Sequence, residues 1–129
     1  MPEENMFEIL KSVDNTNTWE IVKDDTLGFF PVCKQLFSGI VLVAYCALEE
    51  GDLYSLSIIK SFDNGKTWEE VELLIAEIIC GQIGLIQLFS GIICITYWKE
   101  EESEDKQFII RSYDNAKTWS EPEEIVAEE

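Results

Sequence analysis

The sequence contains no histidine and a single arginine. Without histidine, the chain has no imidazole to act as a general base, as a metal ligand or as the partner of a serine or cysteine nucleophile. Basic residues are scarce as well, with 9 lysines and arginines against 26 aspartates and glutamates and a net charge of −17 at pH 7. Phosphate backbones and anionic membrane surfaces repel such a chain, so we expect it to bind neither nucleic acid nor a membrane.

The excess of acid has two interpretations, a solvated surface or a patch for calcium or a basic partner. No group of aspartates and glutamates has the spacing of a calcium-binding loop. Cys-x-x-Cys pairs, which would indicate zinc or thioredoxin chemistry, do not occur. We therefore favour the solvated surface and predict neither a metal nor a cofactor.

The four cysteines lie in apolar stretches, which favours buried free thiols; they are Cys33, Cys46, Cys80 and Cys94. Residues 1–4 are acidic and no apolar signal-peptide segment follows them. Free thiols and no visible signal peptide together predict a cytoplasmic protein.

Residues 73–98 carry one charge, Glu77, and so deserve comparison with a membrane-spanning helix, which needs about 20 apolar residues. Three glycines interrupt the stretch, at positions 81, 84 and 91, and β-branched isoleucine is abundant. Part of the stretch also recurs earlier within a shorter apolar run. A strand-rich core segment is therefore the better interpretation.

Two motifs repeat along the chain. Residues 35–40 read Gln-Leu-Phe-Ser-Gly-Ile and recur unchanged at residues 87–92, an offset of 52 that also relates Tyr45 to Tyr97. The second motif has the form Ser-x-Asp-x-x-x-Thr-Trp and occurs three times. Its members are Ser12, Asp14, Thr18 and Trp19; Ser61, Asp63, Gly65, Thr67 and Trp68; and Ser112, Asp114, Thr118 and Trp119.

The order of the motifs defines a repeating unit of about fifty residues. An apolar strand ends at Gln-Leu-Phe, a Ser-Gly turn leads into a β-branched strand, a charged loop follows, a third strand enters the Ser-x-Asp motif and a fourth leaves at the tryptophan. This order predicts an all-β fold of four-stranded antiparallel meanders. Residues 1–26 make half a unit with only the last two strands, and residues 27–79 and 80–129 make two complete units.

The residue types of the second motif suit a hairpin turn. Asp and Asn side chains accept hydrogen bonds from nearby backbone amides, and glycine supplies a positive φ. The tryptophan buries roughly 200 Å², on the order of 5 kcal/mol before costs are subtracted. We favour this structural role for the aspartates over a catalytic or metal-binding one.

The three motifs resemble the Asp-box (BNR) repeat of sialidase-like β-propellers. The middle copy fits the pattern in full, whereas Thr16 and Ala116 stand at the glycine position of the outer copies. The resemblance implies four-stranded blades around an axis, first strand innermost, with the Asp boxes at the rim. The chain would hold about two and a half blades, and rings have four to eight. Because an open stack would expose apolar faces, we predict that other copies close the ring by homo-oligomerisation; the rival interpretation is a piece of a longer propeller.

The resemblance also bears on function. Sialidases of this family grip the substrate carboxylate with three arginines, use a Tyr–Glu nucleophile and an Asp acid/base, and carry an Arg-Ile-Pro motif. This chain has only Arg111 and no such motif, so we predict no catalytic residues and a non-catalytic module that binds a glycan or a protein; the alternative is a degenerate or partial sialidase or other glycoside hydrolase. Tyr45, Tyr97 and Trp98 are candidates for stacking on a sugar, with core packing as their other interpretation.

Overall fold

The computed structural model describes residues 6–12, 14, 17–48 and 54–126. These residues form ten strands and no helix, which confirms the predicted all-β class. Every paired strand is antiparallel to its neighbour, which confirms the predicted pairing. The strands are β1 (Met6–Lys11), β2 (Glu20–Leu27), β3 (Phe29–Gln35), β4 (Val41–Leu48), β5 (Tyr54–Ser61), β6 (Glu72–Ala76), β7 (Ile79–Gln87), β8 (Ile93–Glu101), β9 (Glu104–Ser112) and β10 (Glu123–Glu124).

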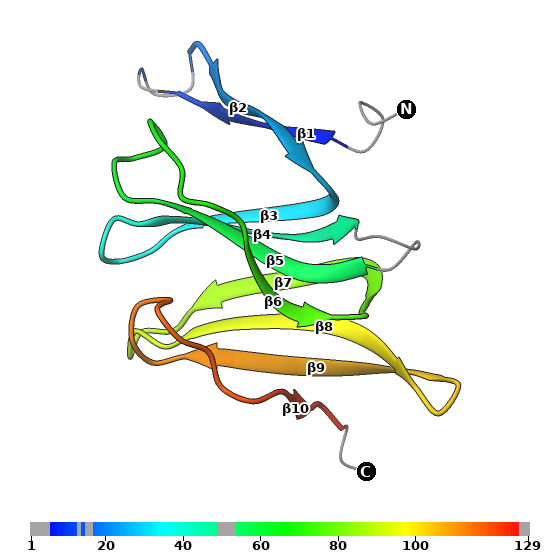
Figure 1. Ribbon diagram of the computed structural model, residues 1–129. Coiled ribbons are helices and arrows are strands. Elements are labelled where there is room, and N and C mark those ends of the chain that lie inside the picture. Colours follow the sequence, from blue (N-terminus) through cyan, green and yellow to red (C-terminus); the bar gives the residue numbers. More distant parts are fainter. Residues whose placement is uncertain (1–5, 13, 15–16, 49–53, 127–129) are drawn as a thin grey trace.

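The strands group into three sheets in chain order. A hairpin of β1 and β2 comes first, a middle sheet in the order β3-β4-β5-β6 follows, and a last sheet has the order β7-β8-β9-β10. In Figure 1 the hairpin lies at one end, the middle sheet beside it, and the last sheet at the other end. The three sheets do not close into a ring within the described residues, so both ends of the stack are open.

The main core lies between the middle and last sheets. Leu42, Ala44 and Ile58 of the middle sheet face Ile95 and Ile110 of the last sheet, and all five are fully buried. Strands β3 and β7, the first strands of their sheets, also lie against each other. The middle sheet is therefore covered on this face by the last sheet.

A second core covers the opposite face of the middle sheet. Val43, Tyr45 and Ile59 are buried there against Phe7 and Ile9 of the hairpin. Because β4 is covered on both faces, it is apolar at nearly every position, unlike a strand with one face in water. The uninterrupted apolar runs of the sequence thus result from sheets stacked face to face.

The repeated hexapeptide makes the same turn twice. The amide of Leu36 donates to the carbonyl of Ile40 and that of Gly39 to the carbonyl of Leu36, each at 2.8 Å, and the residues 52 positions later form the same bonds. Gly39 has a φ of 101°, a conformation that glycine adopts without steric cost. Identical sequence has produced identical local structure.

The cysteines differ from the prediction of four buried free thiols. Cys94 is buried and free, whereas Cys33 is free but exposed on β3. Cys46 is disulfide-bonded, to a sulfur outside the side chains that the structure describes. Disulfides persist mainly in oxidising compartments, so one of the two arguments for a cytoplasmic location no longer holds. The location remains a prediction.

The apolar stretch at residues 73–98 forms strands. Residues 73–98, compared above with a spanning helix, lie in β6, β7 and β8. Among the described residues, no helix has the length and apolarity needed to cross a membrane. The charged loop at residues 49–52 and Thr16 of the first Ser-x-Asp motif lie outside the described part of the chain.

Candidate functional site

The three Ser-x-Asp turns are held by one pattern of hydrogen bonds. In the middle turn, Asp63 accepts from the Thr67 amide at 2.8 Å, from the Thr67 hydroxyl at 2.6 Å and from the Ser61 hydroxyl at 2.8 Å. The Ser61 oxygen in turn accepts from the Gly65 amide at 2.8 Å. Each carboxylate oxygen and the serine are therefore engaged inside the turn.

The outer turns repeat this pattern. Asp114 accepts from the amide and hydroxyl of Thr118 and from Ser112. Asp14 accepts in the same way from Thr18 and Ser12. Carboxylates held by three donors of their own turn serve that turn, which is the role that we favoured from the sequence.

Ala116 occupies the position that glycine holds in the middle turn. Its φ is 71°, against 89° for Gly65, so it adopts the left-handed conformation despite its methyl group. Such a conformation costs about 1 kcal/mol or more outside glycine. Two interactions offset this cost. Ala116 is fully buried in the main core, and its carbonyl accepts a hydrogen bond from the Lys60 ammonium of the middle sheet at 3.0 Å.

The turn hydrogen bonds lower the carboxyl pKa values. The Thr118 hydroxyl and amide, with a smaller effect from Ser112, lower the pKa of Asp114 to about 2. The equivalent threonines and serines lower the pKa values of Asp63 and Asp14 as well. All three groups are exposed, so screening by water limits what each contributes to stability.

These lowered pKa values predict that the stability of the fold depends on pH. A carboxyl with a lowered folded pKa stabilises the fold above its unfolded pKa of about 3.9, and this contribution disappears as pH falls through the folded value. We expect Asp114→Asn to lower the melting temperature at pH 7 but to differ little from wild type near pH 2. Thermal unfolding followed by circular dichroism from pH 7 to pH 2 measures this. Glu70→Gln, an exposed carboxylate with the same charge change, is the control. A deficit of Asp114→Asn that is independent of pH would contradict the assignment.

Two of the three aromatic candidates lie in the cores. Tyr45 and Tyr97 are each 1% exposed. Tyr45 meets the edge of Phe7 with ring centroids 5.1 Å apart, and Tyr97 stacks on Phe108 at 5.8 Å. A ring this completely covered has no face to offer a ligand, so stacking on a sugar is wrong for these two residues and core packing holds. Trp98 is half-buried on β8, and stacking on a sugar stays a prediction for this residue.

The hydroxyl of Tyr97 is a buried group without a hydrogen-bond partner among the described residues. Its burial, reinforced by the negative charge of Glu101, raises its pKa to about 12. The group therefore stays protonated at neutral pH.

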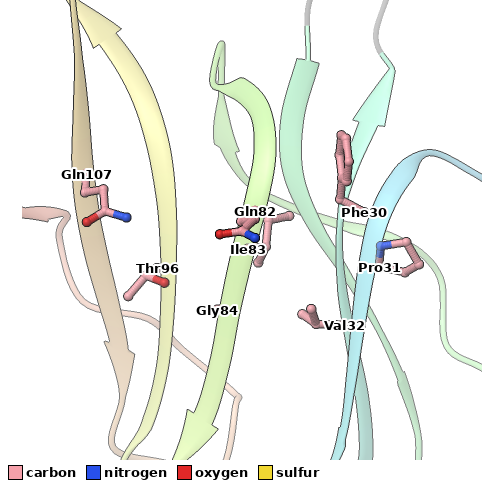
Figure 2. Close-up of a pocket in the computed structure, with 8 residues that line it drawn as sticks. All are labelled: Phe30, Pro31, Val32, Gln82, Ile83, Gly84, Thr96 and Gln107. Atoms are coloured by element: carbon pink, nitrogen blue, oxygen red, sulfur yellow. The ribbon is translucent and has the colours of Figure 1, made fainter.

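A groove of about 400 Å³ lies along the first strands of the two four-stranded sheets. Figure 2 shows Phe30, Pro31 and Val32 of β3 on one side, and the side chains of Thr96 and Gln107 beyond β7 on the other. The full lining is Phe30, Pro31, Val32, Gln82, Ile83, Gly84, Thr96 and Gln107.

Backbone irregularities shape this groove. The pairing of β3 with β4 shifts register between Phe29 and Val32, and that of β7 with β8 shifts between Ile79 and Gly84. Both shifts fall at equivalent places in the repeat, where a bulge bends a strand and redirects its side chains. Phe30, with a φ of 54°, lies in the first of them.

The lining determines what the groove can bind. None of its eight residues is charged, and its polar groups are two amides and a hydroxyl that both donate and accept hydrogen bonds. Aromatic and aliphatic side chains supply the rest of the surface. This combination suits a neutral polar ligand and offers no cation to an anionic one. Gln82 and Gln107 carry no repeat signal in the sequence, because neither has a glutamine at the equivalent position of the other unit.

The described residues contain no group of three or more His, Cys, Asp or Glu side chains placed to hold a metal ion. Comparison with known proteins adds no relative: no protein-family model matches the chain, and no curated protein matches it. The resemblance to the Asp-box repeat therefore rests on the three motifs themselves.

Proposed function

We propose that this chain is a non-catalytic Asp-box module of the sialidase-like propeller type, which binds a glycan or protein ligand and completes its ring with further copies. The observation that carries the binding role is the uncharged groove between β3 and β7. The ligand that it fits best is a neutral sugar, whose hydroxyls pair with amide groups and whose apolar face packs on Phe30 and Pro31.

The blade-like interpretation is supported by the order of strands and their stacking. Each four-stranded sheet follows chain order, the sheets pack face to face, and the first strands lie against each other. In a propeller those strands line the axis, where many members of such folds bind their ligands. The groove would then face the axis, and the Asp-box turns would hold the rim.

The polar side chains argue against glycoside hydrolysis. Arg111, the single arginine, donates to Glu123 at 2.8 Å and does not line the groove. Most glycoside hydrolases use two carboxyl groups on either side of the bond to be broken, and sialidases use a tyrosine nucleophile with an acid. None of the described lining residues is a carboxylate or a tyrosine. A degenerate sialidase therefore remains only as the alternative.

Binding without turnover is the expected result. We expect the chain to retain neutral glycans on an array and to release no fluorophore from a fluorogenic sialoside. Combined replacement Gln82→Ala and Gln107→Ala should weaken binding about 10-fold or more, because two hydrogen bonds of about 1 kcal/mol each are lost. Isothermal titration calorimetry with the best array ligand measures the change.

The control is Lys66→Ala, an exposed side chain at the Asp63 turn and away from the groove, which should bind like wild type. Sialoside turnover that a single carboxylate substitution abolishes would favour the alternative function. Binding that is unchanged in the double glutamine variant would exclude the groove as the site.

A further inference from the structure

The hairpin end of the stack carries an apolar face on which no other sheet of the described chain packs. Leu10 and Ile21 are direct cross-strand neighbours, so their side chains share one face of the hairpin. Leu10 is 50% exposed, whereas its repeat equivalents Ile59 and Ile110 are 1% and 0% exposed. Trp19 is also exposed, while Trp68 and Trp119 pack against the cores. We call the surface formed by Leu10, Trp19 and Ile21 the front face.

The opposite end of the stack is a second open face. On the last sheet, Ile86 pairs with Cys94, Cys94 with Arg111, and Thr96 with Ile109, so these five side chains share one face. They line a groove of about 410 Å³ together with Gly84, Leu85 and Leu88. We call the surface formed by Ile86, Cys94, Thr96, Ile109 and Arg111 the back face.

The chain already brings faces of these two kinds together twice. Ile9 and Ile58 are the repeat equivalents of Ile109; Ile9 packs on the middle sheet and Ile58 packs on the last sheet. In each contact, the sheet on the other side contributes its equivalent of Leu10. This residue is Ile59 where the hairpin meets the middle sheet, and Ile110 where the middle sheet meets the last sheet. In both contacts, a back face of one sheet thus packs on a front face of the next. The front face of the hairpin and the back face of the last sheet are the two faces left uncovered among the described residues.

We propose that the back face of the last sheet binds the front face of a second copy of this chain, head to tail. This inference rests on the proposed function and specifies the residues of its assembly contact. Leu10, Trp19 and Ile21 of the second copy would cover Ile86 and Ile109. Because the two faces differ, the contact is heterologous, and it closes a ring when the rotation per chain allows.

Polar groups also take part in this packing. Between the middle and last sheets, the Phe37 amide donates to Gln87 at 2.8 Å and the Ser38 hydroxyl donates to Asn115 at 2.9 Å. Phe89 and Ser90 are their equivalents at the back face; both are exposed, and within the described chain neither makes the corresponding bond. Because residues 1–26 contain no counterpart of Gln87, the hairpin of a second copy would have to supply another acceptor for the Phe89 amide.

Complementation between two variants tests the proposal. Leu10→Glu disables the front face and Ile86→Glu the back face, and both residues are about half-exposed, so each variant should fold. Wild type should sediment as a dimer or larger at about 100 µM, a concentration at which a contact of standard size is populated. Each variant alone should be monomeric. Their equimolar mixture should form a 1:1 dimer, because one intact front face and one intact back face remain.

The control is Phe62→Glu, which should assemble like wild type. Phe62 is exposed although its sheet is covered on both faces, so it lies outside the stacking contact. If Leu10→Glu loses its strand signal in circular dichroism, Trp19→Glu replaces it as the front-face variant. The expected loss in each single variant is at least 10-fold in association constant.

Three results would overturn the proposal: wild type that stays monomeric at about 100 µM, single variants that still assemble, or a mixture that does not. Gly84 and Thr96 line both grooves, but both variants leave these two residues, Gln82 and Gln107 in place, so none of the three results decides the ligand-binding role. Array binding by the monomeric variants reports on that role separately.

Discussion

Replacing Ile58 by alanine is expected to lower the free energy of unfolding by about 3 to 4 kcal/mol, whereas the same replacement of Ile109 should lower it by about 1 kcal/mol. The two residues are equivalent in the repeat and lie at the same point of their sheets. Ile58 is fully buried between the middle and last sheets, and Ile109 is half-buried on the open back face. The difference arises because a truncated side chain leaves a cavity only where a neighbour covers it.

Urea denaturation followed by tryptophan fluorescence measures both values. The experiment is done at low protein concentration, where the chain is monomeric, and the slope of the unfolding line shows whether the variants unfold in two states. Equal costs at the two positions would mean that Ile109 is already covered within a single chain. A cost at Ile109 that grows with protein concentration would link its burial to assembly.

The secondary structure followed from the sequence because local and repeated signals agree. The hexapeptide at residues 35–40 contains the glycine that its turn requires, and its exact copy marks the same turn in the next unit. The Ser-x-Asp motif contains the donors and acceptors of its internal turn bonds within eight residues, so those bonds form locally. The last turn also accepts hydrogen bonds from the middle sheet at Asn115 and Ala116. Runs such as β4, apolar at nearly every position, indicated sheets covered on both faces.

The groove could not be predicted because tertiary geometry creates it. Pro31 and Gly84, at the two register shifts, are residue types that mark bulges in strands, but they do not indicate which side chains the shifts bring to the surface. Gln82 and Gln107 come from different strands and converge only in the folded sheet. Pattern reasoning could only single out aromatics, and two of those, Tyr45 and Tyr97, were needed in the cores.

The cysteines show the same limit. An apolar neighbourhood predicts burial, but Cys33 lies on β3, at the edge of its sheet, and is exposed. Cys46 is fully buried as expected, yet it is oxidised. Whether two sulfurs meet depends on their distance in the folded chain, which spacing in the sequence does not fix.

Gly28→Ala is expected to destabilise the fold by about 3 kcal/mol, through a steric conflict that no side-chain movement relieves. Gly28 lies between β2 and β3, where the chain passes from the hairpin into the middle sheet. A methyl group there would lie 2.6 Å from the ring of Tyr45 and 2.7 Å from the carbonyl oxygen of Cys46. The ring is held in the core and the carbonyl belongs to β4, so the backbone itself must shift.

Gly39→Ala separates this conflict from the general effect of losing a glycine. Gly39 has a positive φ, but nothing lies within 4 Å of an added methyl group, so only conformational strain of about 1 kcal/mol is expected. Urea midpoints of the two variants, measured with that of wild type, give the comparison. Tyr45→Phe in the Gly28→Ala background should restore nothing, because the ring carbon and the carbonyl oxygen remain in place. Equal urea midpoints for the two glycine variants would show that the hairpin can move away from the middle sheet. The packing of the hairpin on the middle sheet, which holds the front face in place, would then be weaker than its buried aromatic contact indicates.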